Sequence, residues 1–87
     1  RGILLCGTGQ GMNMAANKCK GIRAALCYTT FGAIMSREHN DANILVTGAW
    51  MISIEQALNI IEAFLFAKYS GGRHDIRIKK LMDLEKE

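Results

Sequence analysis

A cysteine and three closely spaced glycines stand near the start of the chain, in the run LLCGTGQGMNMAANK over residues 4–18. Alternating glycines let a backbone bend tightly and turn several amides to one side, where they bind an anion. That anion is a phosphate or a negative charge that develops during a reaction. Because a thiol facing a helix N-terminus loses its proton more readily than a free thiol, Cys6 is a candidate nucleophile or general base. Cys6 and the loop amides together suit proton abstraction beside a carbonyl.

The loop and its cysteine also fit roles without catalysis, whereas two familiar phosphate-binding motifs fit poorly. A tight turn without a ligand is the alternative for the loop, and an inert buried cysteine is the alternative for Cys6. The residues after Gly11 are not the Gly-Lys-Ser/Thr of a P-loop, and G-x-G-x-G is not the G-x-G-x-x-G of dinucleotide-binding proteins. The spacing of Cys19 and Cys27 from Cys6 does not match zinc ligands, so we expect these two cysteines to be structural.

Two polar segments add further candidates. In SREHNDAN (residues 36–43), His39 is the natural acid or base near neutral pH, and Asn40 can hydrogen-bond a polyol or the turn itself. In GGRHDIR (residues 71–77), Arg73 and Arg77 share one helical face, where two guanidinium groups can bind a phosphate. The alternatives are a surface loop histidine and a solvated basic face.

Apolar periodicity predicts the elements that must hold these residues. We expect alternating strands and helices, namely strands over 2–6, 22–27 and 43–47 and helices over 12–18, 30–38, 53–70 and 73–86. This alternation favours an α/β fold with a parallel sheet, in which ligands bind beyond the carboxyl ends of the strands. The segments predicted to lie there are 6–11, 28–30 and 47–50. Three strands make a narrow sheet, so we also expect further strands or a partner.

The third long helix has the clearest signals. Ser53 and Gln56 fit a capping box, and Gly71-Gly72 is the expected end of the helix. One stripe is expected to face the core, formed by Ile54, Leu58, Ile61 and Leu65. The last helix is amphipathic and can dock on its own domain or on a partner subunit.

Composition narrows the class of protein. The chain has 87 residues, 49% of them hydrophobic, and a net charge of +3, which is typical of one small globular domain and argues against a nucleic-acid partner. No run of about 18 apolar residues is present, so we expect no membrane span. An odd number of cysteines without a signal peptide favours a reducing, cytoplasmic location.

Four segments together resemble the B-type ribose-5-phosphate isomerases, a family that also includes galactose- and allose-6-phosphate isomerases. The segments are CGTGQGMNMAANK, GIRAALC, SREHNDAN and GGRHDIR. The resemblance implies a Rossmann-like three-layer α/β/α fold, interconversion of aldose and ketose phosphates through an enediol, no metal or cofactor, and a homodimer or homotetramer with its active site at the subunit interface. It also implies that residues 1–87 are the C-terminal part of one sugar-phosphate isomerase domain without its N-terminal strands, and that helix 73–87 docks on a partner subunit.

The resemblance also implies roles for individual residues. Cys6 matches the base that moves the proton between C1 and C2, and His39 matches a residue that helps to open the sugar ring. Thr8 belongs to the loop that stabilises the enediolate. The implied substrate-binding residues are Gly7, Gly9, Gln10, Gly11, Asn40, Arg73 and Arg77, of which the two arginines reach a neighbouring subunit's site.

The sequence leaves open the role of Trp50 and the identity of the substrate. Trp50 stands where many members of the family carry an arginine, and it either stacks on a sugar or packs at the interface. The sequence does not distinguish ribose 5-phosphate from galactose or allose 6-phosphate. A subunit that binds a phosphosugar, or assembles with a partner, without catalysis is the alternative from another functional class.

Overall fold

Three parallel strands form the centre of the fold, which a computed structural model describes over residues 1–86. The strands are β1 (Gly2–Cys6), β2 (Ala24–Leu26) and β3 (Ile44–Gly48), in the order β1-β3-β2. Because β3 pairs with both neighbours, its carboxyl end lies beside theirs, with Cys6 opposite Gly48 and Leu26 opposite Val46. Glu87, the last residue of the predicted segment 73–87, lies outside the described residues.

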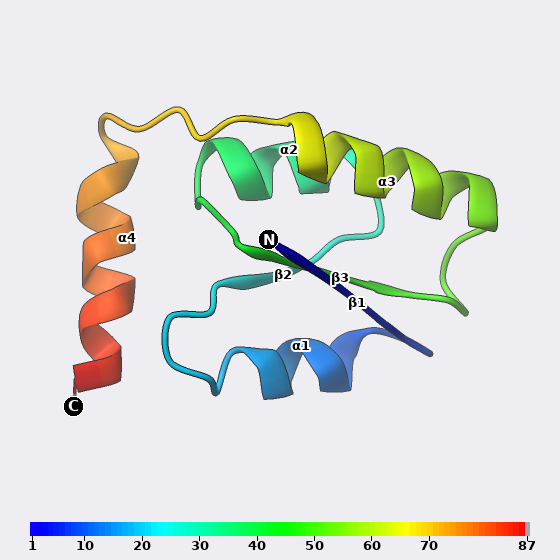
Figure 1. The fold of residues 1–87 in the computed structure, drawn as a ribbon, viewed down its shortest axis with the longest axis horizontal. Helices are drawn as coiled ribbons and strands as arrows, with labels where there is room; N and C mark the ends of the chain where they lie inside the picture. The colour runs from blue at the N-terminus through cyan, green and yellow to red at the C-terminus, as the bar shows by residue number, and fades with distance from the viewer. Residues whose placement is uncertain (87) are drawn as a thin grey trace.

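Helices cover both faces of the sheet, as Figure 1 shows. The short helix α1 (Gln10–Ala16) lies on one face, and α2 (Thr30–Glu38) and α3 (Ile54–Phe66) lie together on the other. Parallel strands need such crossover connections, because each strand must start again at the same end of the sheet. The predicted three-layer α/β/α arrangement is therefore confirmed. None of the helices within residues 1–86 is long and apolar enough to cross a membrane.

The core lies between β3 and the helices α2 and α3, and it differs from the predicted one. Ile60 and Phe64 of α3 are fully buried, whereas Ile54 is 83% exposed and Leu58 is 62% exposed. Of the predicted stripe, only Ile61 packs against the core, whereas Ile54, Leu58 and Leu65 are exposed, so the prediction was wrong for these three residues. Helix α3 has apolar side chains on more than one side, so periodicity could not select the buried side. The side of α3 that carries Ile60 and Phe64 faces α2, whose small Ala33 side chain is buried in the same core.

The predicted start of α3 is confirmed, whereas its predicted end is wrong. The capping box is confirmed, because Ser53 Oγ accepts from the Gln56 N–H (3.1 Å) and the Ser53 N–H donates to Gln56 Oε1 (2.8 Å). The predicted end at Gly71-Gly72 is wrong, since α3 stops at Phe66 and Ala67 is already extended. The chain then crosses the end of α2, where the Ser70 N–H donates to the Glu38 carbonyl (3.0 Å).

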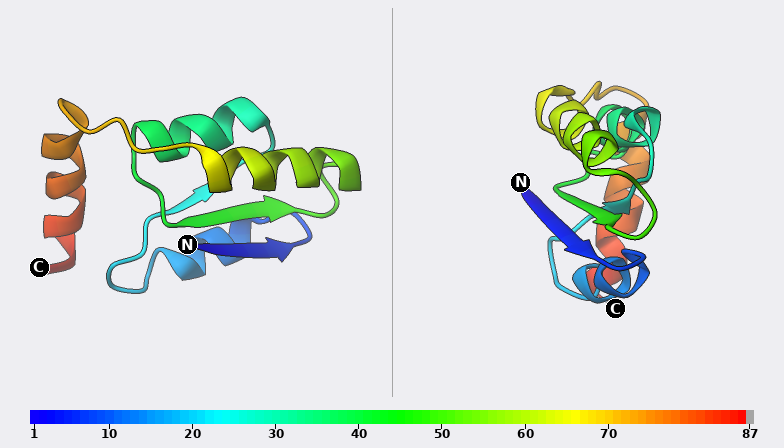
Figure 2. Two further views of the ribbon diagram at one scale, coloured as in Figure 1. Left: turned by 45° about the horizontal axis from the view of Figure 1, so that its top comes forward. Right: turned by 90° about the vertical axis from the view of Figure 1, so that its right-hand side faces the viewer.

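Helix α4 (His74–Asp83), followed by the short 3₁₀ turn η1 (Leu84–Lys86), stands outside the three layers. The left view in Figure 2 shows it at one end of the sheet rather than on a face. Few contacts fix its far end to the rest of the chain. Glu85 Oε1 accepts from the Gly21 N–H (2.8 Å), and Met82 Sδ lies 3.4 Å from Arg23 Nη1.

Candidate active site

Cys6 ends β1 and opens the glycine loop (residues 7–11), which turns the chain into α1. The backbone of Gly9 is left-handed, with φ 83°, a conformation that glycine adopts without strain. Its N–H donates to Cys6 Sγ at 3.2 Å, and the Gln10 N–H donates to Thr8 Oγ1 at 3.3 Å. The sulfur therefore lies beside loop amides, and the first amides of α1 have no partner within the helix. This arrangement can hold a negatively charged oxygen next to the thiol.

The ends of the other two strands meet this loop. The Ala49 N–H donates to the Cys6 carbonyl (2.8 Å), and the Trp50 N–H donates to the Gly7 carbonyl (2.9 Å). The Tyr28 hydroxyl donates to the Thr8 carbonyl. The three segments that were predicted to meet at the carboxyl edge of the sheet are thus brought together.

Gly48 is the position where β3 passes closest beneath the loop. A Cβ added there would lie 2.5 Å from the Thr8 carbonyl oxygen and 2.7 Å from that of Gly7, both of which are backbone atoms that cannot move aside cheaply. We expect Gly48→Ala to lower the free energy of unfolding of the full-length protein by about 3 kcal/mol, as overpacking does. Urea unfolding measures this loss. Gly11→Ala is the matched control, because a Cβ there meets nothing within 4 Å, and equal stability of the two variants would contradict the prediction.

A second group of candidate residues surrounds the end of α2. His39 is the C-cap of this helix, and its N–H donates to the Met35 carbonyl (2.9 Å). The following turn has a left-handed residue, Asp41, whose carboxylate pairs with Arg37 (2.9 Å) and Arg23 (3.4 Å). These ion pairs hold the turn that carries His39 and the exposed Asn40.

His74, the first residue of α4, stacks on His39. The ring centroids are 4.4 Å apart and the planes differ by 18°. His74 is 9% exposed. Burial lowers the pKa of His74 below its ordinary value, and the nearby His39, Arg73 and Arg77 act in the same direction, against a smaller opposing effect of Asp75.

The lowered pKa of His74 predicts a loss of stability in acid. The unfolded chain takes up a proton near the ordinary pKa of 6.5, whereas the folded protein takes it up only at lower pH. Stability from neutral His74 is therefore complete above that value and falls as the pH drops below it. We expect urea midpoints to fall more between about pH 7.5 and about pH 5.5 for the wild type than for His74→Phe. Equal changes in the two proteins would contradict this.

Arg73 and Arg77 are both exposed on α4. Within residues 1–86, neither side chain donates a hydrogen bond or forms an ion pair, in contrast to Arg23 and Arg37. Two guanidinium groups one helical turn apart are thus available to a ligand such as a phosphate.

The two groups of candidate residues lie at opposite ends of the sheet. Cys6 lies at the carboxyl end, whereas α2 runs back across the sheet and carries His39 to the amino end, where α4 also stands (Figure 1). A strand of five residues spans roughly 15 Å. One chain therefore does not bring Cys6 together with His39, Asn40 and the two arginines.

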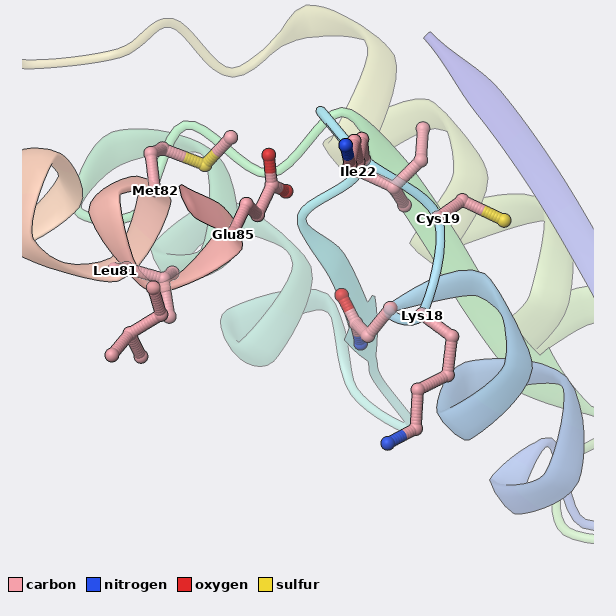
Figure 3. Close-up of a pocket in the computed structure, with 9 residues that line it drawn as sticks. Lys18, Cys19, Ile22, Leu81, Met82 and Glu85 are labelled. Atoms are coloured by element: carbon pink, nitrogen blue, oxygen red, sulfur yellow. The ribbon is translucent and has the colours of Figure 1, made fainter. Parts of the chain in front are cut away.

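One hollow of the surface lies away from both groups. Its volume is about 380 Å³, and it opens between the α1–β2 connection and the end of α4, where Lys18, Cys19, Leu81 and Glu85 are among the lining residues (Figure 3). A smaller hollow of about 280 Å³ lies at the carboxyl end, and Tyr28 and Asn59 help to line it. No three His, Cys, Asp or Glu side chains of residues 1–86 come together to hold a metal ion.

Sequence reasoning missed the side chains that support His39. His74 lies inside the quoted segment GGRHDIR, but no spacing indicates that its ring meets a histidine 35 positions earlier. The pairing of Asp41 with Arg23 is likewise a long-range contact. Only the separation of Asp41 from Arg37 by one helical turn was a local signal.

Comparisons with known proteins show the family and agree with the fold. The family model described as Ribose/Galactose Isomerase matches residues 1–81. Ribose-5-phosphate isomerase B of Escherichia coli is 46% identical over 84 residues, which cover 97% of this chain and 56% of that protein. A structure of Clostridium thermocellum ribose-5-phosphate isomerase B has a TM-score of 0.97 and 51% identity, over 99% of this chain and 58% of that one.

A third match includes a ligand. The crystal structure of Mycoplasma genitalium ribose-5-phosphate isomerase B with bound ribulose-5-phosphate has a TM-score of 0.95 and 44% identity, and the match covers 98% of this chain and 56% of that one. The chain thus spans a little over half the length of these relatives.

Proposed function

The chain belongs to the ribose/galactose isomerase family, and from this membership we propose that the full-length protein interconverts ribose 5-phosphate and ribulose 5-phosphate through an enediol. One observation supports this chemistry above all. The sulfur of Cys6 lies 3.2 Å from the Gly9 amide nitrogen, inside a glycine loop whose amides can hold an oxyanion. We expect the protein to act in the reducing cytoplasm, which suits its free thiols.

The Cys6 thiolate acts as the general base. It takes the proton from C2 of the open aldose, and the electron pair left behind forms the C1–C2 double bond. The electrons of the C1 carbonyl move onto its oxygen, which the amides of the glycine loop stabilise. The thiol then returns the proton to C1, and the proton of the C2 hydroxyl passes to the C1 oxygen as the C2 ketone forms. Thr8 and Gln10 belong to the same loop, in which the Gln10 N–H donates to the Thr8 hydroxyl.

The complete site is composed of two chains. The glycine loop of one subunit faces the His39 end of another, so that His39 opens the sugar ring and Asn40 binds the sugar. Arg73 and Arg77 bind the phosphate, and the segment 73–87 docks on the partner. The separation of the two groups within one chain supports this arrangement, as does the exposure of apolar side chains that a partner can cover. These side chains include Leu58, Phe66 and Ile76.

Trp50 borders the proposed site. It is 82% exposed, and its ring lies so close to Gly7 that an added Cβ would be 2.8 Å from it. Stacking on a sugar and packing against a partner are both compatible with an exposed ring fixed on the loop.

An assay of the full-length protein tests the proposal. We expect conversion of ribose 5-phosphate to ribulose 5-phosphate, with weaker or no conversion of galactose and allose 6-phosphates. A protein that converts one of the six-carbon sugars instead has the alternative substrate. A protein that binds these compounds by calorimetry but converts none of them is a binding or assembly subunit, and the proposed enzymatic function is then wrong.

A further inference from the structure

We propose that His74 is a positioning residue for His39, which it holds in the orientation needed to open the sugar ring. The inference rests on the proposed function, because it takes from there the role of His39. In the segment GGRHDIR the sequence motifs indicate roles for Arg73 and Arg77 but none for His74, so the inference adds a residue to the proposed site.

The stack is the contact that orients the two rings. The planes are nearly parallel, 18° apart, with centroids at 4.4 Å. Neither imidazole makes a side-chain hydrogen bond within residues 1–86, so no other directional contact of the described chain fixes either ring. Without His74, the His39 side chain at the C-cap of α2 can turn between rotamers.

The backbone on both sides of the stack is held independently of the rings. The His39 N–H donates to the Met35 carbonyl (2.9 Å), and the Ser70 N–H ties the incoming chain to the Glu38 carbonyl (3.0 Å). The Tyr69 hydroxyl donates to Asp75 Oδ1 (2.5 Å) and thereby fastens the start of α4. Loss of the His74 ring should therefore leave both backbone segments in place.

The charges around His74 favour its neutral form. His39 faces it from the end of α2, and Arg73, Arg77 and the carboxylate of Asp75 surround it from α4. Of these groups, only Asp75 favours a proton on His74. A neutral ring lets His39 gain and lose a proton without a second positive charge stacked on it, which suits an acid–base residue.

Two substitutions in the full-length enzyme separate positioning from other roles. We expect His74→Ala to lower kcat for ribose 5-phosphate about tenfold, with KM changed less than about threefold, since a misplaced catalytic group slows the reaction without weakening substrate binding. His74→Phe keeps a flat ring against His39 and should restore kcat to within about threefold of the wild type. Lys68→Ala, an exposed change in the chain between α3 and α4, is the control. If His74→Ala does not fold, His74→Gln replaces it.

Each other outcome overturns the inference. An unchanged kcat in folded His74→Ala means that His39 needs no support. A large rise in KM in both the Ala and Phe variants means that His74 contacts the substrate phosphate itself. A His74→Phe variant as slow as His74→Ala means that the ring face is not the positioning element. If the wild type converts no sugar phosphate, the proposed function fails first, and the role of His74 fails with it.

Discussion

Replacing Cys6 by alanine in the full-length protein should abolish the conversion of ribose 5-phosphate, with kcat reduced by at least about 10³-fold. The reason is geometric as well as chemical. The sulfur lies at the mouth of the glycine loop, where the Gly9 N–H meets it at 3.2 Å. No other acid–base side chain belongs to this loop, since its remaining residues are glycines, Thr8 and Gln10. The rate of isomerisation, followed as ribulose 5-phosphate appears, measures the effect.

The fold should survive this change, because Cys6 is only half-buried and alanine fits its backbone. Substrate binding should also survive, which separates loss of chemistry from loss of the site. Cys19→Ala provides a matched control, since Cys19 is an exposed free thiol at a distance from the loop. Turnover near the wild-type rate in Cys6→Ala would show that another group removes the proton.

Mixing two inactive variants should restore activity if two subunits share each site. We expect Cys6→Ala and His39→Ala each to be nearly inactive alone. In a mixed dimer, the intact Cys6 of one chain faces the intact His39 of the other, and one of the two sites is complete. Random exchange makes about half of the dimers mixed, so we expect about a quarter of the wild-type activity. The activity of an equimolar mixture, refolded together, measures this.

The result decides between a shared site and a site within one chain. A site built within one chain would stay inactive in every mixture of the single variants, because each chain would lack one of its own groups. The double variant Cys6→Ala, His39→Ala, mixed with an equal amount of wild type, is the control. If sites are shared, both sites of each mixed dimer are defective, and the activity per chain falls to about a quarter of the wild-type value. If sites lie within one chain, it falls only to about half.

Local sequence signals determined much of the fold. Strand β1 and helix α2 begin and end at 2–6 and 30–38, as predicted. The apolar run of residues 3–5 and the N-cap of α2, where the Thr29 side chain accepts from the Gly32 N–H, are both properties of neighbouring residues. The capping box of Ser53 and Gln56 was predictable for the same reason. The contact of the Cys6 thiol with the glycine loop is local for the same reason, since Cys6 and the Gly9 amide that it meets are three positions apart.

Only the tertiary structure decided the features that depend on distant residues. Helix α3 has apolar side chains on several sides, and packing against α2 chose Ile60 and Phe64. The contact between His39 and His74, and the separation of His39 from Cys6 along the sheet, arise from the directions of α2 and α4 in space. Periodicity and capping act over one or two turns, whereas these arrangements depend on how whole elements pack. The sequence thus indicated the candidate site residues, and the fold decided that one chain separates them.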